Sequence, residues 1–110
     1  MRLPNGDRAA IDPQKITGYL LSVTHPVGRS KARFFRGLGF SEATAGDLER
    51  ALLEVAKTGE VVETIAVPYG TKFVVDGTLR TPAGAAISVR TVWVVETGQS
   101  LPRFVTAYPA

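Results

Sequence analysis

The chain has 110 residues, 45% of them hydrophobic, and a formal net charge of +3, which is enough for one domain over residues 1–110 but not for two cores. It contains no cysteine, and this excludes disulfides, thiolate metal sites and a cysteine nucleophile. No apolar run approaches the roughly 18 residues of a membrane span, and the N-terminal stretch MRLPNGDRAAID has no secretory h-region. We therefore expect a cytoplasmic protein without a membrane partner.

The first part of the chain carries the signals of short helices. Asp12 stands directly before a proline, an N-cap followed by a first-turn proline, and apolar residues at helical spacing predict a helix over about 13–21. Ser30 can cap a second helix, which we expect over about 31–38.

A third helix is expected to begin at Ser41 or Thr44 and to end at Gly59. It carries the clearest amphipathic stripe of the chain, at positions i, i+3, i+4 and i+7. The residues of this stripe are Leu48, Ala51, Leu52 and Val55.

The second half of the chain is rich in β-branched residues separated by turn signals. We expect four strands, over 60–67, 71–79, 86–95 and 101–108. Their short connections favour an antiparallel meander. The sequence therefore predicts an α+β fold in which about three N-terminal helices pack on a C-terminal four-stranded antiparallel β-meander.

The last hairpin is expected to gather polar groups on one face of the sheet. If it centres on Gly98, Arg90 lies opposite Thr106 and Ser88 lies opposite Tyr108. This register collects one cation and several hydroxyls into a patch. The alternative reading is the ordinary polar face of a half-exposed sheet.

Positive charge is concentrated in residues 25–40, which contain four cations and no acid, whereas residues 41–66 have a net charge of −4. The four cations are Arg29, Lys31, Arg33 and Arg36. Such a segment attracts phosphates or an acidic protein, although it also fits a solvated helix face.

The single histidine, His25, lies in the loop T-H-P-V-G-R-S-K ahead of the second helix. It is the only side chain whose ordinary pKa lies near neutrality, which makes it a candidate general base or acid, although one loop histidine also suits a structural role.

The acids are scattered and no phosphate-binding glycine motif is present, so neither a metal nor a cofactor is expected. Metal-free cleavage of RNA, in which the substrate's own 2′-hydroxyl is the nucleophile, needs only a base, cations and a proton donor.

Nearly the whole chain resembles an uncharacterised bacterial family, domain of unknown function 6883. The segments that carry this resemblance are LPNGDRAAID (3–12), THPVGRSKARFFRGLGF (24–40), PYGTKFVVDG (68–77) and RTVWVVETG with RFVTAYP (90–109).

A second resemblance, carried by R-T-V-W (90–93) and the ending V-T-A-Y-P (105–109), is to the barnase, EndoU, colicin and RelE-like toxin ribonucleases. It implies metal-independent RNA cleavage by a sheet-borne site. The residues that it implies for catalysis are His25, Lys31, Arg90, Thr106 and Tyr108. From the basic segment, the turn at 69–72 and the polar patch of the hairpin, we expect Arg29, Arg33, Lys72 and Ser88 to bind substrate. The EndoU pattern has two histidines and this chain has one, whereas a RelE-like set of Lys, Arg and Tyr would need no second histidine.

Two functions remain open from the sequence. One is a toxin-like ribonuclease, which implies RNA as substrate and a small acidic neutralising protein as partner. The other is a non-catalytic interaction module with a nuclease-like fold, of the immunity or antitoxin type. The ribonuclease hypothesis requires the loop that contains His25 to pack against the polar side of the final hairpin.

Overall fold

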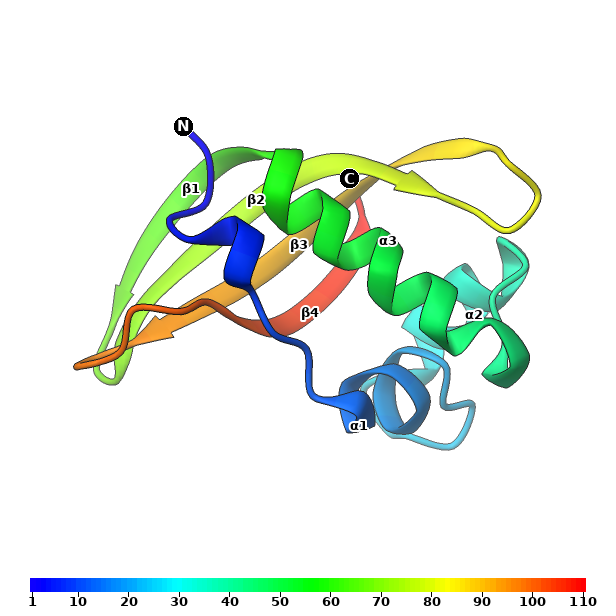
Figure 1. The fold of residues 1–110 in the computed structure, drawn as a ribbon. Helices are drawn as coiled ribbons and strands as arrows, with labels where there is room; N and C mark the ends of the chain where they lie inside the picture. The colour runs from blue at the N-terminus through cyan, green and yellow to red at the C-terminus, as the bar shows by residue number, and fades with distance from the viewer.

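The computed structural model describes all residues 1–110, with the helices in the first half of the chain and the strands in the second (Figure 1). The helical elements are η1 (Gly6–Arg8), α1 (Pro13–Lys15), η2 (Ile16–Leu20), α2 (Arg29–Gly37), η3 (Glu42–Thr44) and α3 (Ala45–Thr58). The strands are β1 (Glu60–Val67), β2 (Gly70–Arg80), β3 (Ala86–Glu96) and β4 (Arg103–Pro109). They form one antiparallel sheet in the order β1-β2-β3-β4, which confirms the predicted α+β fold.

The first predicted helix is present but is not a regular α-helix. After the N-cap Asp12, whose side chain accepts from the Gln14 backbone N–H, α1 continues directly into the π-helical turn η2. The Leu21 N–H donates to the Ile16 carbonyl at 2.9 Å, a bond that spans five residues. The second helix begins earlier than predicted, at Arg29, and its N-cap is Gly28 rather than Ser30.

The predicted register of the last hairpin is wrong by two residues. Arg90 lies opposite Tyr108 and Val92 lies opposite Thr106, and β4 starts at Arg103 rather than at 101. The hairpin therefore centres one residue beyond Gly98. A shift of two keeps each side chain on its face, so Arg90, Thr106 and Tyr108 still share the face predicted for them.

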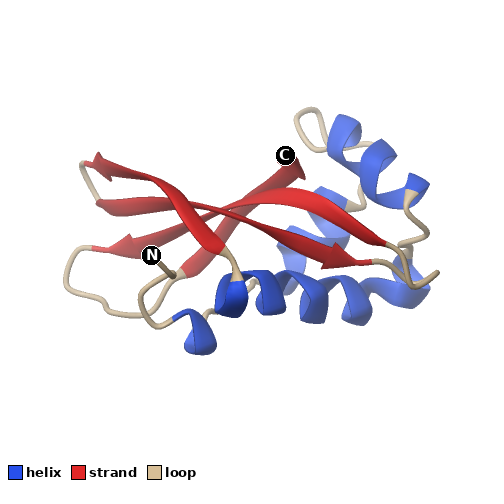
Figure 2. Cartoon of the chain, turned by 90° about the horizontal axis from the view of Figure 1, so that it is seen from above, coloured by secondary structure: helices blue, strands red, loops and turns tan.

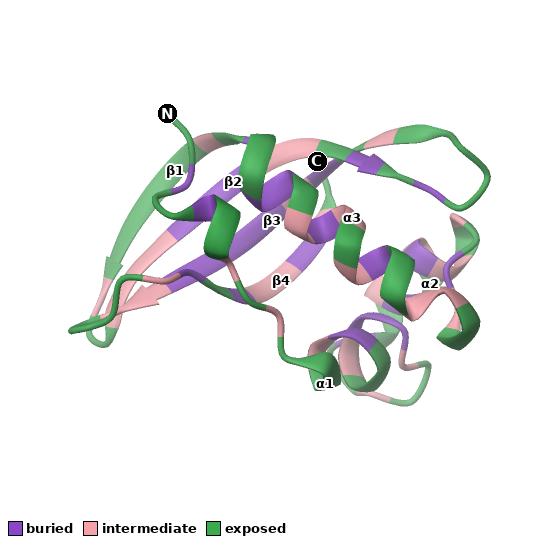
Figure 3. Cartoon of the chain, in the orientation of Figure 1, coloured by how far each residue is buried: buried purple, intermediate pink, exposed green.

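The core lies between one face of the sheet and α3, which runs along that face (Figures 1 and 2). The predicted stripe of α3 supplies Leu48, Leu52 and Val55, each at most 1% exposed, and the buried residues of the helix face the sheet (Figure 3). At the centre of the sheet, the Trp93 indole N–H donates to Thr91 Oγ1, which bonds to the Val75 carbonyl. Every polar group of this network is therefore satisfied.

The two outer edges of the sheet differ. At β4, the Ala10 N–H donates to the Pro102 carbonyl, the Phe104 N–H donates to the Ala10 carbonyl, and α1 and α2 lie beside the strand. At β1, the outer edge receives one bond, in which the Val61 N–H donates to the Met1 carbonyl. None of the helices has both the length and the apolar character needed to cross a bilayer.

Candidate functional site

The side chains that converge from distant parts of the sequence meet around the ring of Tyr19. The π turn places this residue beside β4, where its Oη lies 2.9 Å from Thr106 Oγ1. The ring of His25 contacts the Tyr19 ring edge-on, with centroids 5.1 Å apart. We call the group formed by Lys15, Tyr19, His25, Lys31 and Thr106 the Tyr19 cluster.

Two ammonium groups lie close to the Tyr19 ring. Lys15 Nζ lies 5.1 Å and Lys31 Nζ 5.9 Å from the ring centroid, close enough for cation–π attraction. Neither lysine takes part in any of the five ion pairs of the structure. Lys15 donates one hydrogen bond, to the Val105 carbonyl at 3.2 Å, and an ammonium has three donors. The cluster therefore presents unneutralised positive charge with donors to spare.

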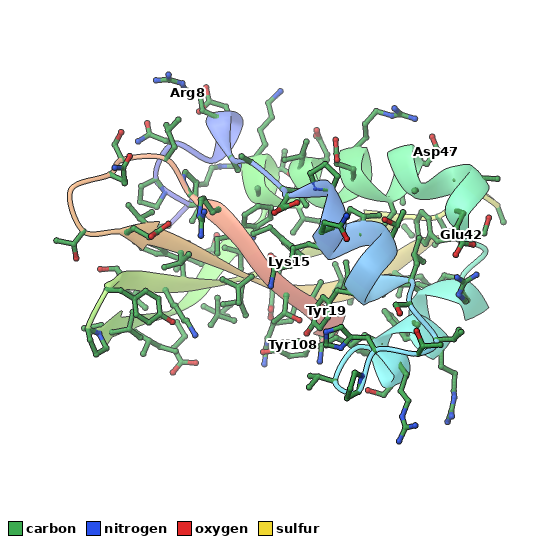
Figure 4. The ribbon with its side chains drawn as sticks, turned by 90° about the horizontal axis from the view of Figure 1, so that it is seen from below. Arg8, Lys15, Tyr19, Glu42, Asp47 and Tyr108 are labelled. Atoms are coloured by element: carbon green, nitrogen blue, oxygen red, sulfur yellow. The ribbon has the colours of Figure 1, made fainter.

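A bulge in β4 makes this arrangement possible. Between the pairs Val92–Thr106 and Trp93–Phe104 the register shifts by one residue, so Val105 is the extra residue of β4. Its carbonyl is the one that Lys15 binds. Thr106 then points to the same face as Tyr108, and Figure 4 shows Lys15, Tyr19 and Tyr108 close together.

His25 is held by its own loop. Its Nδ1 accepts hydrogen bonds from the backbone N–H groups of Val27 (3.1 Å) and Gly28 (2.9 Å). The neutral ring therefore carries its proton on Nε2. Protonation of Nδ1 would break both bonds, so this geometry suits a hydrogen-bond donor that orders the start of α2 better than it suits a general base.

Arg90 is already paired. Its Nε and Nη2 donate to the two carboxylate oxygens of Asp76 at 2.7 and 2.8 Å. The hydrogen bond from Arg90 lowers the pKa of Asp76, and the same bond raises the pKa of Arg90. Since Tyr108 lies opposite Arg90, this bidentate pair borders the Tyr19 cluster without adding free charge to it.

The remaining predicted residues divide into two groups. Arg29 and Arg33 are exposed on α2, the helix that carries Lys31, and neither forms an ion pair. Lys72 is not near the cluster: it contacts the Tyr69 ring at the β1–β2 turn. Ser88 pairs with Thr78 and lies beyond the end of the β4 ladder.

Sequence reasoning missed Lys15 and Tyr19, because Tyr19, with Ile16 and Leu20, is one of the apolar residues at helical spacing that predict the first helix. The spacing of the two residues, i and i+4, was the available signal, because it places them on one helical face. The fourth cation of the basic segment, Arg36, is structural: it donates to the Leu21 carbonyl and pairs with Glu42, whose pKa this hydrogen bond lowers.

The site is an open surface beside shallow depressions. The largest depression, about 410 Å³, lies away from it, between α3 and the β2–β3 turn, and mixes charges of both signs, including Asp47, Arg50 and Arg80. Another, about 300 Å³, shares Lys15 with the Tyr19 cluster. No three His, Cys, Asp or Glu side chains lie close enough together to hold a metal ion.

Comparison with known proteins places the fold and the family. The structure is similar to a chain of the contact-dependent growth inhibition toxin–immunity protein complex from Klebsiella pneumoniae 342, with a TM-score of 0.71 and 19% identity over 90% of this chain and 91% of that chain. At this identity the similarity is one of fold. No match was found among curated proteins. A family model described as "Domain of unknown function (DUF6883)" matches residues 2–110, so the chain belongs to this family.

Proposed function

We propose that this protein is a toxin-like, metal-independent ribonuclease that cleaves RNA through the substrate's 2′-hydroxyl, with the Tyr19 cluster as its phosphate site. The observation that carries the proposal is that two lysines without ion-pair partners, one from α1 and one from α2, lie 5.1 and 5.9 Å from the centre of one phenol ring beside the β4 bulge. The fold shared with a chain of a toxin–immunity complex supports the toxin-like part of it.

The proposed chemistry uses the groups of the cluster as follows. The 2′-oxygen attacks the phosphorus and the bond to the 5′-oxygen breaks, which leaves a 2′,3′-cyclic phosphate and a free 5′-hydroxyl. Lys15 and Lys31 offset the negative charge that builds up on the phosphoryl oxygens. The proton that the 2′-hydroxyl loses ends on the departing 5′-oxygen, and the hydroxyls of Tyr19 and Tyr108, which can both accept and donate, are the candidates that relay it. His25 donates from Nε2 and orders the loop.

This assignment differs from a mechanism with histidine as the base. It is supported by the loop hydrogen bonds: His25 Nδ1 already accepts from two backbone N–H groups, which leaves the proton of the neutral ring on Nε2. It corresponds to a RelE-like set of Lys and Tyr groups. Arg90 is proposed to hold its strand face in place through Asp76 rather than to bind phosphate.

The test is expression of the wild type, Lys31→Met and Lys57→Met, with growth measured and total RNA run on a gel, followed by incubation of purified protein with RNA in EDTA. Lys57 is an exposed lysine on α3 outside the cluster and is the matched control. We expect cleavage by the wild type and by Lys57→Met, and a loss of about 100-fold for Lys31→Met, the scale of losing one charge-stabilising donor. Intact RNA with folded wild-type protein, together with normal growth, would reject the proposal.

The second candidate is a non-catalytic module that binds a protein of the toxin–immunity type. Two observations favour it: the cluster lies on an open surface rather than in a deep cleft, and the structurally similar chain comes from a complex that contains both kinds of protein. A stable complex with a small acidic protein, formed equally by wild type and Lys31→Met without any RNA cleavage, would support it.

A further inference from the structure

A depression of about 300 Å³ adjoins the Tyr19 cluster and has no role in the chemistry proposed above. It lies where the segment before α1 crosses the start of β4. Its lining residues are Ala10, Ile11, Asp12, Lys15, Arg103 and Phe104. Lys15 belongs both to the Tyr19 cluster and to the lining of the depression. A nucleotide whose phosphate is bound at the cluster can therefore reach the depression with its base.

The lining combines apolar surface with a single carboxylate. Ile11 and Phe104 supply apolar atoms, and Arg103 is tied to Glu96 at 2.9 Å. Asp12 forms no ion pair. One of its oxygens, Oδ1, accepts from the Gln14 N–H, and the other oxygen has no partner in the chain. A free acceptor beside apolar surface suits a flat, aromatic group with hydrogen-bond donors at its edge.

We propose that this depression binds the nucleobase next to the cleaved phosphate and that Asp12 selects a base with an amino group on its Watson–Crick edge. The inference rests on the proposed function. Its volume is at the lower end for small-molecule sites, which fits one base and little more. A carboxylate only accepts hydrogen bonds, so it favours the amino groups of guanine, adenine or cytosine. Uracil instead presents two carbonyl oxygens around one N–H, and those oxygens are repelled.

Asp12→Asn is a sharp test, because asparagine is as good an N-cap as aspartate and the start of α1 is kept. Its amide can donate to uracil carbonyls, which aspartate cannot do. Purified wild type, Asp12→Asn and the control Asp47→Asn, an exposed carboxylate on α3 that does not line the depression, are incubated with an RNA pool of random sequence. The bases on both sides of every cleaved bond are then counted by sequencing.

We expect wild type and Asp47→Asn to disfavour uracil at one of the two flanking positions, and Asp12→Asn to reduce that discrimination by about tenfold, the scale of one hydrogen bond to a charged group. Unchanged discrimination in an active Asp12→Asn variant would overturn the base site and leave the ribonuclease proposal standing.

If the wild type cleaves no RNA, the proposed function fails, and the base site is judged by binding alone. Affinities are then measured for short single-stranded RNAs with 2′-deoxy sugars, which differ only in carrying uracil or cytosine. Equal affinities for wild type would overturn the inference. Tighter binding of cytosine that is lost in Asp12→Asn would support it.

Discussion

At the scale of single residues, the contact between Tyr19 and Thr106 joins the helical half of the chain to the sheet. The two hydroxyls lie 2.9 Å apart and both side chains are half-buried. The bond therefore positions the phenol and also contributes to the stability of the fold. The contribution to stability can be measured by itself, because unfolding experiments need no RNA.

Removal of either hydroxyl, by Tyr19→Phe or Thr106→Val, should destabilise the fold by about 1 kcal/mol, and the double variant should lose little more than either single one. The measurement is urea unfolding of all four proteins in a double-mutant cycle. Losses that add to within about 0.3 kcal/mol would show that the two groups do not interact.

The pair of Asp76 and Arg90 should make stability depend on acidity. The hydrogen bond from Arg90 lowers the pKa of Asp76 in the folded state, so the stabilisation is present above the unfolded value, about 3.9, and is lost as the pH falls through the lowered folded value. Thermal unfolding should therefore show wild type more stable than Asp76→Asn at neutral pH, with the difference shrinking below about pH 4. Arg90→Met should show the same loss of acid dependence. If the difference in stability between wild type and Asp76→Asn stayed constant down to low pH, the ion pair could not be its cause.

Individual site residues were the hardest part to predict from sequence. The roles of Lys15 and Tyr19 depend on a π turn and on a bulge in β4, and no local sequence pattern predicts either of these features. His25 could be singled out from the sequence as the only histidine, but which of its ring nitrogens accepts hydrogen bonds depends on the structure of its loop.

At the scale of elements, α3 approaches the sheet closely because β2 has a glycine beneath it. A Cβ at Gly77 would lie 2.9 Å from Val55 Cγ1, closer than side-chain atoms normally approach. The amphipathic stripe of α3 was evident in the sequence, whereas the reason for a glycine inside a strand became clear only from the packing.

Gly77→Ala should therefore destabilise the protein by about 1–3 kcal/mol through overpacking. The matched change Gly37→Ala, on α2 with no atom within 4 Å of the added methyl, should cause no loss. Both substitutions restrict the unfolded chain equally, so their difference isolates the helix–sheet contact. Chemical denaturation compares them, and equal stabilities would refute the proposed steric cause.

Element positions followed well from the sequence because turn residues and hydrophobic spacing are local signals. The register of the last hairpin did not, because the six-residue connection from 97 to 102 tolerates more than one alignment. The face of Arg90, Thr106 and Tyr108 was nevertheless right, since the error at these positions was two residues, whereas the bulge at Val105 turns Phe104 into the core.

At the scale of the whole molecule, the charged side chains are unevenly distributed, and the helices and strands occupy separate halves of the chain. Lys31 brings α2 to the Tyr19 cluster, while Glu42 and Asp47 lie toward one end of the molecule, away from Lys15 and Tyr108 near its middle (Figure 4). The fold class was predictable because helices and strands are segregated along the chain. The convergence of α1, α2 and β4 was not, because it depends on contacts between residues about 90 positions apart.

If α2 guides RNA to the cluster, Arg29→Ala and Arg33→Ala should each lower the slope of log affinity against log salt concentration by about 0.7, the value for one phosphate contact on a single strand. Fluorescence anisotropy with a labelled single-stranded RNA measures this, and Lys57→Ala is the control. If the salt dependence of binding did not change in either arginine variant, RNA would not run along α2.

The unequal edges of the sheet set a limit on self-association. The margin along β4 is partly covered by the chain's own backbone and by a lysine, which leaves the margin along β1 more open to a foreign strand. In two copies that joined through β1, each copy would cover the more open edge of the other. Strand-to-strand association of the folded protein is therefore expected to favour pairs over fibres.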